Sequence, residues 1–280
     1  MTMKLSFYPG CSLEGMARDY GRSIAAVFKD LGIELVELED WSCCGATAAH
    51  SLSEMMAVAL PARNLALAEK SGLDIVSPCA NCFNRLRFSQ RMIKKKIFDI
   101  PWQVTGELQV YDMTRFLAQP ENLQRIARRV AKPLSGLSVV CYYGCQMVRP
   151  VKITGFTDYE NPQTLDNIAA AVGAQVIDWS FKATCCGASI GIGRKEIQES
   201  LTARILQKAR MTGADAIVVS CPLCQTNLDL IQQNSHEPAM PVFYFTELLQ
   251  LAFAPGGDPK QFRWHIADPV ALLAQKGLLG

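Results

Sequence analysis

The chain has 280 residues, a net charge of +2 and 49% hydrophobic residues. This composition excludes extensive disorder, and the balanced charge gives no reason to expect nucleic acid or an anionic membrane as a partner. No apolar run reaches the roughly 20 residues that span a bilayer, and the N-terminal apolar stretch is too brief for a secretory signal. We therefore expect a cytoplasmic protein without a transmembrane segment.

Short apolar runs punctuated by glycine or proline alternate with helical patterns along the whole chain. Strands that alternate with helices in this way predict parallel α/β sheets. The expected strands are 3–8, 33–38, 74–77 and 108–111 in the first half, and 137–143, 174–179, 215–219 and 241–245 in the second. The expected helices include 20–31, 165–172 and 197–209, with a linking helix over 123–130.

The second half of the sequence repeats the first. The segment Leu5-Ser-Phe-Tyr-Pro-Gly-Cys11 matches Val139-Val-Cys-Tyr-Tyr-Gly-Cys145. Further along, Cys43-Cys44-Gly45-Ala46 matches Cys185-Cys186-Gly187-Ala188. A duplication of this length indicates two units of the same architecture.

The boundary between the repeats is predicted near 119–136, where Pro120 and Pro133 precede the next strand. We expect a first domain over 1–130 and a second over 131–280. Each is predicted to be a Rossmann-like half with a parallel sheet, and the two halves are expected to be related by a pseudo-twofold axis.

Eleven cysteines have to be interpreted against a reducing compartment, where a disulfide framework is disfavoured and metal binding or redox chemistry is favoured. Ten of them form two copies of one motif. In both copies, 33 residues separate the glycine after the Cys-Cys pair from the last pair of cysteines, and two residues separate that pair. The motif cysteines are Cys11, Cys43, Cys44, Cys79 and Cys82, and then Cys145, Cys185, Cys186, Cys221 and Cys224.

Each of these cysteines ends a predicted strand or lies in the loop just after it. Ligands of open α/β sheets collect at the carboxyl ends of the strands, so three strand ends in each half can converge on one site. Gly45 and Gly187, which follow the two Cys-Cys pairs, permit a sharp turn there. The backbone amides of such a turn can hydrogen-bond sulfide, so both glycines are predicted to take part in cofactor binding.

The number of cysteines bears on the metal. Structural zinc is closed at four ligands, and a cubane iron–sulfur cluster also needs four thiolates. Five cysteines in each motif favour a larger or opened iron–sulfur cluster. An ordinary cluster with one spare thiol, or a zinc ion, remains an alternative for either motif.

The doubled Cys…Cys-Cys-Gly…Cys-x2-Cys pattern resembles the B subunit of heterodisulfide reductase over nearly the whole chain. This resemblance implies two 4Fe-4S clusters of the noncubane type, one on each set of five cysteines, although some relatives hold zinc in one motif. It also implies that a disulfide is clamped between the two clusters and reduced by two electrons, or formed in the reverse reaction. The implied partners in such a complex are the ferredoxin-like C subunit, together with the flavin-containing A subunit.

Two classes of function stay open at the level of sequence. The protein can be the catalytic subunit, acting on a disulfide, a thiol or a sulfur carrier protein. Alternatively, it can be an electron-relay subunit whose partner protein holds the substrate. The sequence contains no nucleotide-binding loop and no ferredoxin-type run of cysteines, so electrons are expected to arrive from another subunit.

A few residues outside the motifs remain ambiguous. Cys141 is expected to be an ordinary buried residue, because it aligns with an apolar position of the first repeat. His50 lies close to the first Cys-Cys pair and is expected to be structural, with donation to the cysteine site as the alternative. His236 and His265 are expected to be structural. The basic stretch 85–96 is expected to be either a solvated helix face or a docking site for an acidic partner or an anionic substrate.

Overall fold

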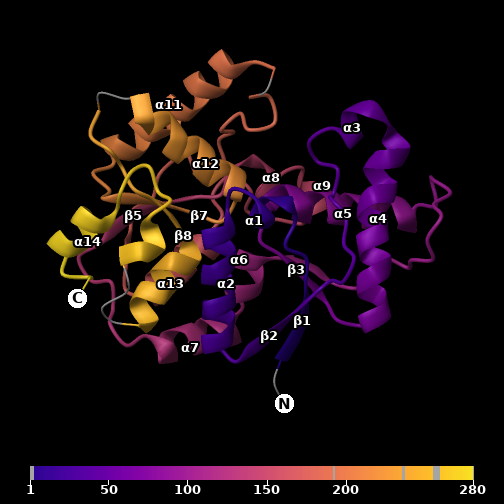
Figure 1. Ribbon diagram of the computed structural model, residues 1–280, viewed down its shortest axis with the longest axis horizontal. Coiled ribbons are helices and arrows are strands. Elements are labelled where there is room, and N and C mark those ends of the chain that lie inside the picture. Colours follow the sequence, from indigo (N-terminus) through magenta and orange to yellow (C-terminus); the bar gives the residue numbers. More distant parts are fainter. Residues whose placement is uncertain (1–2, 192, 235–236, 255–258, 280) are drawn as a thin grey trace.

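The computed structural model describes residues 3–191, 193–234, 237–254 and 259–279. Two four-stranded sheets, one in each half, are parallel throughout (Figure 1). Their strand orders, β2-β1-β3-β4 and β6-β5-β7-β8, are the same arrangement repeated. The strands are β1 (Met3–Phe7), β2 (Ile33–Glu37), β3 (Ile75–Ser77) and β4 (Val110–Asp112), then β5 (Ser138–Tyr142), β6 (Gln175–Val176), β7 (Ala216–Val219) and β8 (Val242–Tyr244). All eight predicted strands are confirmed.

Helices connect the strands, because parallel neighbours need a crossover between them. In the first half these helices are α1 (Cys11–Glu14), α2 (Arg18–Asp30), α3 (Ala49–Leu52), α4 (Glu54–Ser71), α5 (Ala80–Lys94), α6 (Met113–Leu117) and α7 (Pro120–Arg129). In the second half they are α8 (Cys145–Val148), α9 (Val151–Thr154), α10 (Thr164–Ala171), α11 (Lys195–Met211), α12 (Pro222–Leu230), α13 (Phe245–Phe253) and α14 (Val270–Gln275). Two 3-10 turns cover Ile231–Asn234 and Pro259–Phe262. The predicted helices correspond to α2, α7, α10 and α11.

Local sequence explains where the main helices begin and end. The side chain of Ser53 accepts a hydrogen bond from the backbone of Met56 and caps α4, which ends at Gly72 in the left-handed conformation. Pro120 is the first residue of α7, where its missing N–H costs no hydrogen bond. Helix α2 ends just before Gly32, which has a φ of 68°.

The two halves pack through pairs of equivalent helices. Helix α2 of the first half contacts α13 of the second, and α10 of the second contacts α6 of the first. In one contact the hydroxyls of Ser23 and Thr246 are 2.5 Å apart, and in the other those of Thr164 and Thr114 are 3.1 Å apart. Because each contact has a counterpart with the halves exchanged, the halves are related by a pseudo-twofold axis.

The same exchange holds for the helices that carry cysteines. Helix α5 contacts α8, and α12 contacts α1. The side-chain amide of Asn84 on α5 donates to the carbonyl of Gln146 at 3.0 Å and to that of Arg149 at 2.8 Å. In each half, the helix that carries the last cysteine of the motif therefore lies against the helix that begins with the first cysteine of the other motif.

One hydrophobic core continues from the first half into the second. It includes the buried face of α2, with Tyr20 and Phe28, and the inner strands of the second sheet, with Val140 and Val218. Tyr20 stacks on Tyr244 of the other half, with ring centroids 4.0 Å apart. A smaller core lies in the first half alone, beneath α4 and α5. The domain boundary at 130/131 remains a prediction. The shared core packs the two halves against each other.

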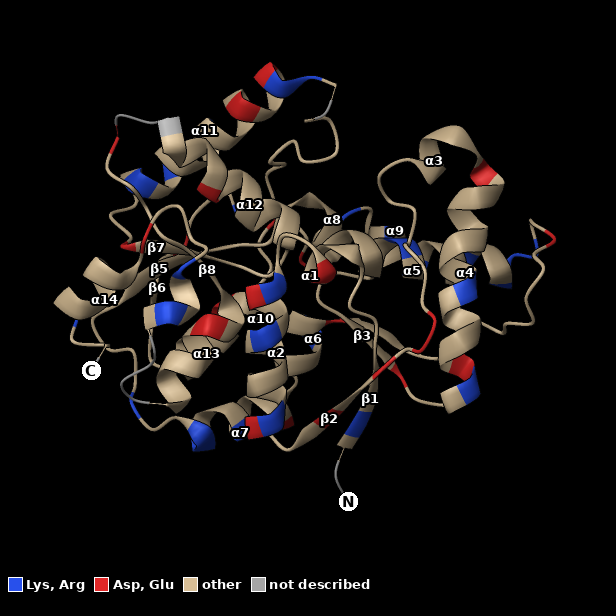
Figure 2. Ribbon diagram, in the orientation of Figure 1, with Lys and Arg blue, Asp and Glu red and all other residues tan. Residues whose placement is uncertain are grey.

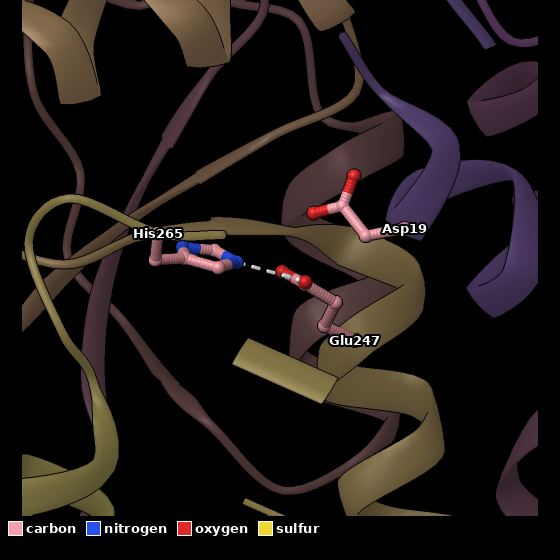
Figure 3. A group of neighbouring side chains, drawn as sticks. All are labelled: Asp19, Glu247 and His265. Atoms are coloured by element: carbon pink, nitrogen blue, oxygen red, sulfur yellow. Dashed lines mark hydrogen bonds and ion pairs between the residues drawn. The ribbon is translucent and has the colours of Figure 1, made fainter. Parts of the chain in front are cut away.

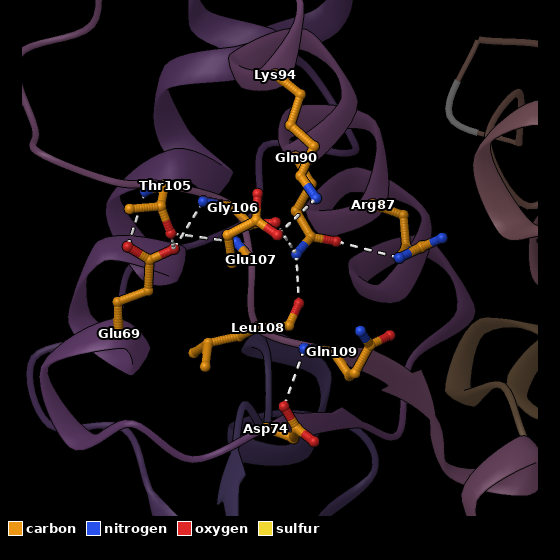
Figure 4. A network of polar contacts seen from close by, with 10 residues as sticks. All are labelled: Glu69, Asp74, Arg87, Gln90, Lys94, Thr105, Gly106, Glu107, Leu108 and Gln109. Carbon is orange, nitrogen blue, oxygen red and sulfur yellow. Dashed lines mark hydrogen bonds and ion pairs between the residues drawn. The ribbon is translucent and has the colours of Figure 1, made fainter.

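The segment between α5 and β4 is held by polar contacts (Figure 4). The Glu69 carboxylate accepts hydrogen bonds from the backbone N–H groups of Thr105 and Gly106, at 2.8 and 2.7 Å. The side-chain amide of Gln90 donates to the carbonyl of Leu108 at 2.7 Å, and Asp74 accepts from the amide of Gln109 at 2.9 Å. These contacts fix the entry into the edge strand.

The C-terminal segment is tied to both halves by a buried charge cluster (Figure 3). His265 Nε2 lies 2.9 Å from Glu247 Oε1, and both side chains are almost wholly buried. Asp19 of α2 lies beside this pair. Asp229 accepts the backbone N–H groups of Ile266 and Ala267, which fastens the same segment to α12.

Acidic and basic residues both occur on the outer helices α2, α4 and α11, as the small net charge suggests (Figure 2). Among the described residues, no helix is both long and apolar enough to cross a membrane.

Candidate metal centre

The cysteines of each motif come from three strand ends of one sheet. In the first half, Cys11 begins α1 just after β1, and Cys79 is the residue before α5, just after β3. The pair Cys43 and Cys44 follows β2, and Cys82 lies in the first turn of α5. The second motif repeats this placement after β5, β6 and β7. The expected convergence at the carboxyl ends of the strands is confirmed, while the role of the cysteines as metal ligands remains a prediction.

In the first half, the sulfurs lie in contact with one another. Cys82 Sγ is 3.4 Å from Cys44 Sγ. Hydrogen bonds from the Cys43 and Cys82 thiols lower the pKa of Cys44 to about 3. Cys79 contacts Cys82, and Cys11 lies near Cys43. The thiols therefore favour at least one thiolate, which is the form that binds metals.

The second half repeats the contacts of the last cysteine pair, whereas a hydrogen bond between Cys145 and Cys185 takes the place of the one between Cys43 and Cys44. Cys186 Sγ is 3.7 Å from Cys224 Sγ, and the hydrogen bond from Cys224 lowers the pKa of Cys186. A hydrogen bond from Cys145 lowers the pKa of Cys185 to about 6. Cys221 contacts Cys224 in the same way as Cys79 contacts Cys82.

The two groups of sulfurs meet at the boundary between the halves. Cys79 and Cys221 share a hydrogen bond, which is the largest cause that raises the pKa of the Cys79 thiol. The pKa of Cys221 is lowered by its hydrogen bonds with Cys224 and Cys79. Both residues are almost fully buried. The last cysteine pairs of the two motifs thus face each other across the pseudo-twofold axis.

Two glycines that the sequence patterns did not single out make room for the sulfurs. Gly10 and Gly144 directly precede the first cysteine of each motif, with φ values of 70° and 69°. A Cβ atom on Gly10 would lie 2.7 Å from Cys82 Sγ, and one on Gly144 would lie 2.8 Å from Cys224 Sγ. Any larger residue would push against a cysteine. The repeated Gly-Cys dipeptide is the sequence signal that identifies both positions.

The glycines after the Cys-Cys pairs form the expected turns. Gly45 and Gly187 have φ values of 73° and 78°. Their backbone N–H groups point at Cys43 Sγ, at 3.5 Å, and at Cys185 Sγ, at 3.3 Å. This geometry can stabilise negative charge on sulfur. Their part in binding a cofactor remains a prediction.

Two buried tyrosines also support the Cys-Cys turns. Tyr8 donates its hydroxyl to the carbonyl of Ser42 at 2.8 Å, and Tyr142 donates to the carbonyl of Thr184 at 2.6 Å. Burial, reinforced by neighbouring cysteines, raises the pKa of both phenols. Both tyrosines therefore stay protonated and hold the backbone just before each Cys-Cys pair.

The remaining ambiguous residues lie apart from the sulfurs. Cys141 is fully buried on β5, so the expectation of an ordinary core residue is confirmed. His50 is exposed on α3 and makes no hydrogen bond to a cysteine in the part of the chain described. His265 is the buried partner of Glu247, and His236 lies outside the described residues.

A small cavity of about 20 Å³ borders the second group of sulfurs and is partly walled by Ala80 and Asn81 of the first half. A larger groove of about 740 Å³, between α2 and β2, contains none of the cysteines. Among the described residues, the only three metal-ligating atoms that all lie within 4.8 Å of one another belong to Asp19, Glu247 and His265. No three sulfurs of the described cysteines are that close together, so the sulfurs of each motif form an extended set. One tetrahedral ion needs a tighter set, whereas a cluster of several irons can be held by a longer one. The donor atoms therefore fit an iron–sulfur cluster.

Comparisons with known proteins agree with this chemistry. A family model described as a cysteine-rich domain, CCG, matches the chain twice, over residues 5–87 and 139–229. The membrane anchor subunit of the 8-methylmenaquinol:fumarate reductase of Wolinella succinogenes is 33% identical, over 97% of this chain and 100% of that protein. The B subunit of the ferredoxin/F(420)H(2)-dependent CoB-CoM heterodisulfide reductase of Methanosarcina acetivorans is 28% identical, over 97% of this chain and 96% of that protein.

A solved structure shows the same fold. The crystal structure of a hypothetical protein from Helicobacter pylori superposes with a TM-score of 0.73 at 8% identity, over 96% of this chain and 52% of that chain. The two matched cysteine-rich domains and the similarity over almost the full length of reductase subunits lead to one assignment. The chain belongs to the cysteine-rich CCG family, among the relatives of the heterodisulfide reductase B subunit.

Proposed function

We propose that the chain is the iron–sulfur catalytic subunit of a heterodisulfide reductase-like complex. Its reaction is the two-electron reduction of a disulfide, or the reverse oxidation of two thiols. The observation that carries this proposal is the contact between Cys79 and Cys221, which joins the two groups of five cysteines at the boundary between the halves. A substrate sulfur taken up at either group would lie next to the other.

Each group of five cysteines would hold one 4Fe-4S cluster. The five ligands in each motif support the noncubane type, since four thiolates complete an ordinary cubane. The cluster would supply electrons one at a time and iron atoms that can bind sulfur. Zinc in one motif is the alternative, and the extended row of sulfurs argues against it.

The balance of the reaction defines what the protein must provide. One disulfide, two electrons and two protons give two thiols. The protein holds the two cysteine groups side by side, so that both sulfurs of the substrate can be bound before the bond breaks. The buried setting of Cys79, Cys82, Cys221 and Cys224 keeps water away from the reacting sulfurs.

The electrons would come from other subunits of the complex. Relatives at this similarity are named as subunits of larger reductases. The proposed partners, in the cytoplasm, are a ferredoxin-like C subunit, together with a flavin-containing A subunit. The second substrate is a small disulfide, a thiol or a sulfur carrier protein.

A second candidate is an electron-relay subunit without a substrate of its own. It is favoured by the 33% identity to a subunit of 8-methylmenaquinol:fumarate reductase, whose name includes fumarate as the acceptor. In that role the two centres would pass electrons between partner subunits, and the contact between Cys79 and Cys221 would shorten the path.

The first experiment measures iron, zinc and acid-labile sulfide in anaerobically purified protein and in three variants. Cys44→Ala and Cys186→Ala should each remove about half of the iron, because each breaks one of the two centres. Cys141→Ala is the matched control and should keep all of it, since Cys141 lies outside both motifs. Zinc in place of iron would contradict the proposal.

The second experiment separates the two candidates. The chemically reduced protein is mixed with a disulfide, and electron paramagnetic resonance is recorded on the oxidised protein with and without added thiol. An enzyme with its own substrate oxidises its centres with one disulfide consumed for every two electrons, and its signal changes on thiol addition. A relay protein holds the same iron but reacts with neither.

A further inference from the structure

The two groups of cysteines differ at one equivalent position. Arg85 on α5 lies three residues after Cys82, and Asn227 on α12 lies three residues after Cys224. Residues three apart on a helix lie on the same face, so both side chains leave the helix on the side of the sulfurs. The first position carries a full positive charge and the second is neutral.

In the second half, the neutral side chain is part of an amide network. Asn227 Nδ2 lies 3.4 Å from Cys186 Sγ and donates to it. Gln198 Nε2 donates to Asn227 Oδ1 at 2.7 Å, which fixes the orientation of the amide. The second group of sulfurs therefore receives a hydrogen bond but no charge from this position.

In the first half, the positive charge of Arg85 is not neutralised by a carboxylate of the described residues and can act on the sulfurs. Arg85 is half-buried, and its guanidinium lies over the ring of Phe88. It forms no ion pair with any carboxylate of the described residues, and the position equivalent to Gln198 is the apolar Met56. The equivalent side chain of the second half, Asn227, reaches Cys186 Sγ, so the matching position of Arg85 lies on the side of α5 that faces the sulfurs of the first motif.

Other charges do not restore the balance. Lys182 is buried near the second group, but its ammonium is neutralised by Asp166 at 2.7 Å and Asp178 at 2.9 Å. Exposure acts in the same direction as Arg85: two cysteines of the first motif are exposed, whereas their counterparts Cys145 and Cys185 are half-buried. Solvent and positive charge both favour the more negative, reduced form of a cluster.

We propose that the two centres are unequal electron acceptors, and that Arg85 makes the first centre, on Cys11 to Cys82, the one with the higher reduction potential. One electron from the donor protein then reduces the first centre before a second electron reduces the other. This inference rests on the proposed function, because it requires an iron–sulfur centre at both sites. Arg85 acts through its charge on the first centre, and its side chain takes no part in bond breaking.

The test is a redox titration of the anaerobically purified protein, with dithionite as the reductant and electron paramagnetic resonance as the readout. Two reduction steps are expected. In Arg85→Gln the potential of the higher step should fall by about 59 mV, which for one electron is about a tenfold change in the equilibrium constant of reduction. The other step should stay in place. Arg85→Lys keeps the charge and should restore most of the shift.

A complementary variant tests the second centre. Asn227→Ala removes a hydrogen bond to sulfur, so it should lower only the step at the lower potential. If Arg85→Gln moves the lower step, or moves neither step while iron and sulfide stay at their normal level, the assignment of Arg85 is wrong. Protein without iron would instead overturn the proposed function itself, and iron analysis on each variant distinguishes these results.

Discussion

Gly10 and Gly144 show how single residues determine the shape of the cysteine groups. Each has a positive φ that residues with a side chain rarely adopt, and each is in closest approach to the last cysteine sulfur of its own motif. Two separate constraints therefore act at each position: the backbone conformation and the space next to sulfur. A substitution at a glycine that is subject to only one of these constraints therefore separates the effect of backbone conformation from that of the contact with sulfur.

Gly10→Ala should reduce both stability and metal content. The Cβ atom would lie 2.7 Å from Cys82 Sγ and displace it, so the iron bound by the first centre should be lost, which is about half of the total. Gly32→Ala is the control, because Gly32 has a similar φ of 68° but no atom within 4 Å of the added Cβ. It should lower the free energy of unfolding by about 1 kcal/mol and keep the iron. Equal iron in both variants would show that the contact with sulfur is unimportant.

The pair formed by Glu247 and His265 makes stability depend on pH. Burial alone would lower the pKa of His265, but the charge and hydrogen bond of Glu247 outweigh it and raise this pKa to about 9. Because the folded-state pKa lies above the ordinary value of 6.5, the stabilisation is complete below about pH 6.5 and is lost as the pH rises through about 9.

Glu247→Gln should therefore destabilise the protein most at low pH. We expect a loss of about 2 to 3 kcal/mol in the free energy of unfolding at pH 6.5, and a much smaller loss above pH 9.5. Anaerobic urea unfolding at several pH values measures it. Glu39→Gln, at an exposed position without an ion pair to the described residues, should change stability little at any pH. A loss that is the same at both pH values would argue against a charged pair.

At the level of secondary-structure elements, the repeat predicted more than the local patterns alone could. Each strand occurs twice, so a short apolar run such as 33–38 is supported by its counterpart at 174–179. The cysteine positions followed from the same reasoning, since parallel strands bring their carboxyl ends to one edge of the sheet. The short helices α1, α3, α8 and α9 were not predicted, because four residues carry no periodic pattern. The long helix α4 was given no predicted range either.

What the sequence could not predict depends on contacts between distant segments. The buried ion pair of Lys182 with Asp166 joins the second Cys-Cys loop to α10, and nothing in the sequence around either residue indicates it. The same is true of the contact between Glu247 and His265. Each of these depends on which elements pack together, and that is decided by the assembled fold.

Tyr20 lies on α2, which packs against α13, and it links this contact between the halves to the loop that precedes Cys221. Its hydroxyl donates to the carbonyl of Ser220, the residue before Cys221, at 2.9 Å in a fully buried setting. Tyr20→Phe should lower the free energy of unfolding by about 1 to 2 kcal/mol, because that carbonyl loses its partner. Tyr111→Phe is the control: Tyr111 makes no side-chain hydrogen bond to the described residues and should cost less than about 0.5 kcal/mol. Equal losses would show that the hydrogen bond contributes little.

At the scale of the whole molecule, the two repeats form one unit. The continuous core includes Val76 of the first sheet and Val218 of the second, and both side chains are fully buried. The cysteine groups also meet at the boundary, so separating the halves would expose apolar surface and break the contact between Cys79 and Cys221. A duplicated sequence has therefore produced a molecule in which neither repeat is expected to be stable alone.

This coupling can be measured with a matched pair of core substitutions. Val76→Ala and Val218→Ala each remove two methyl groups at equivalent places in the two sheets, and each should cost about 2 kcal/mol. If the core is shared, either substitution lowers the free energy of hydrogen exchange equally for the slowest amides of β3 and β7, since these open only when the whole molecule unfolds. A loss confined to the substituted sheet would mean that the halves unfold separately. In that event the centres at the boundary could open without global unfolding, and a substrate could enter between the halves by their relative motion.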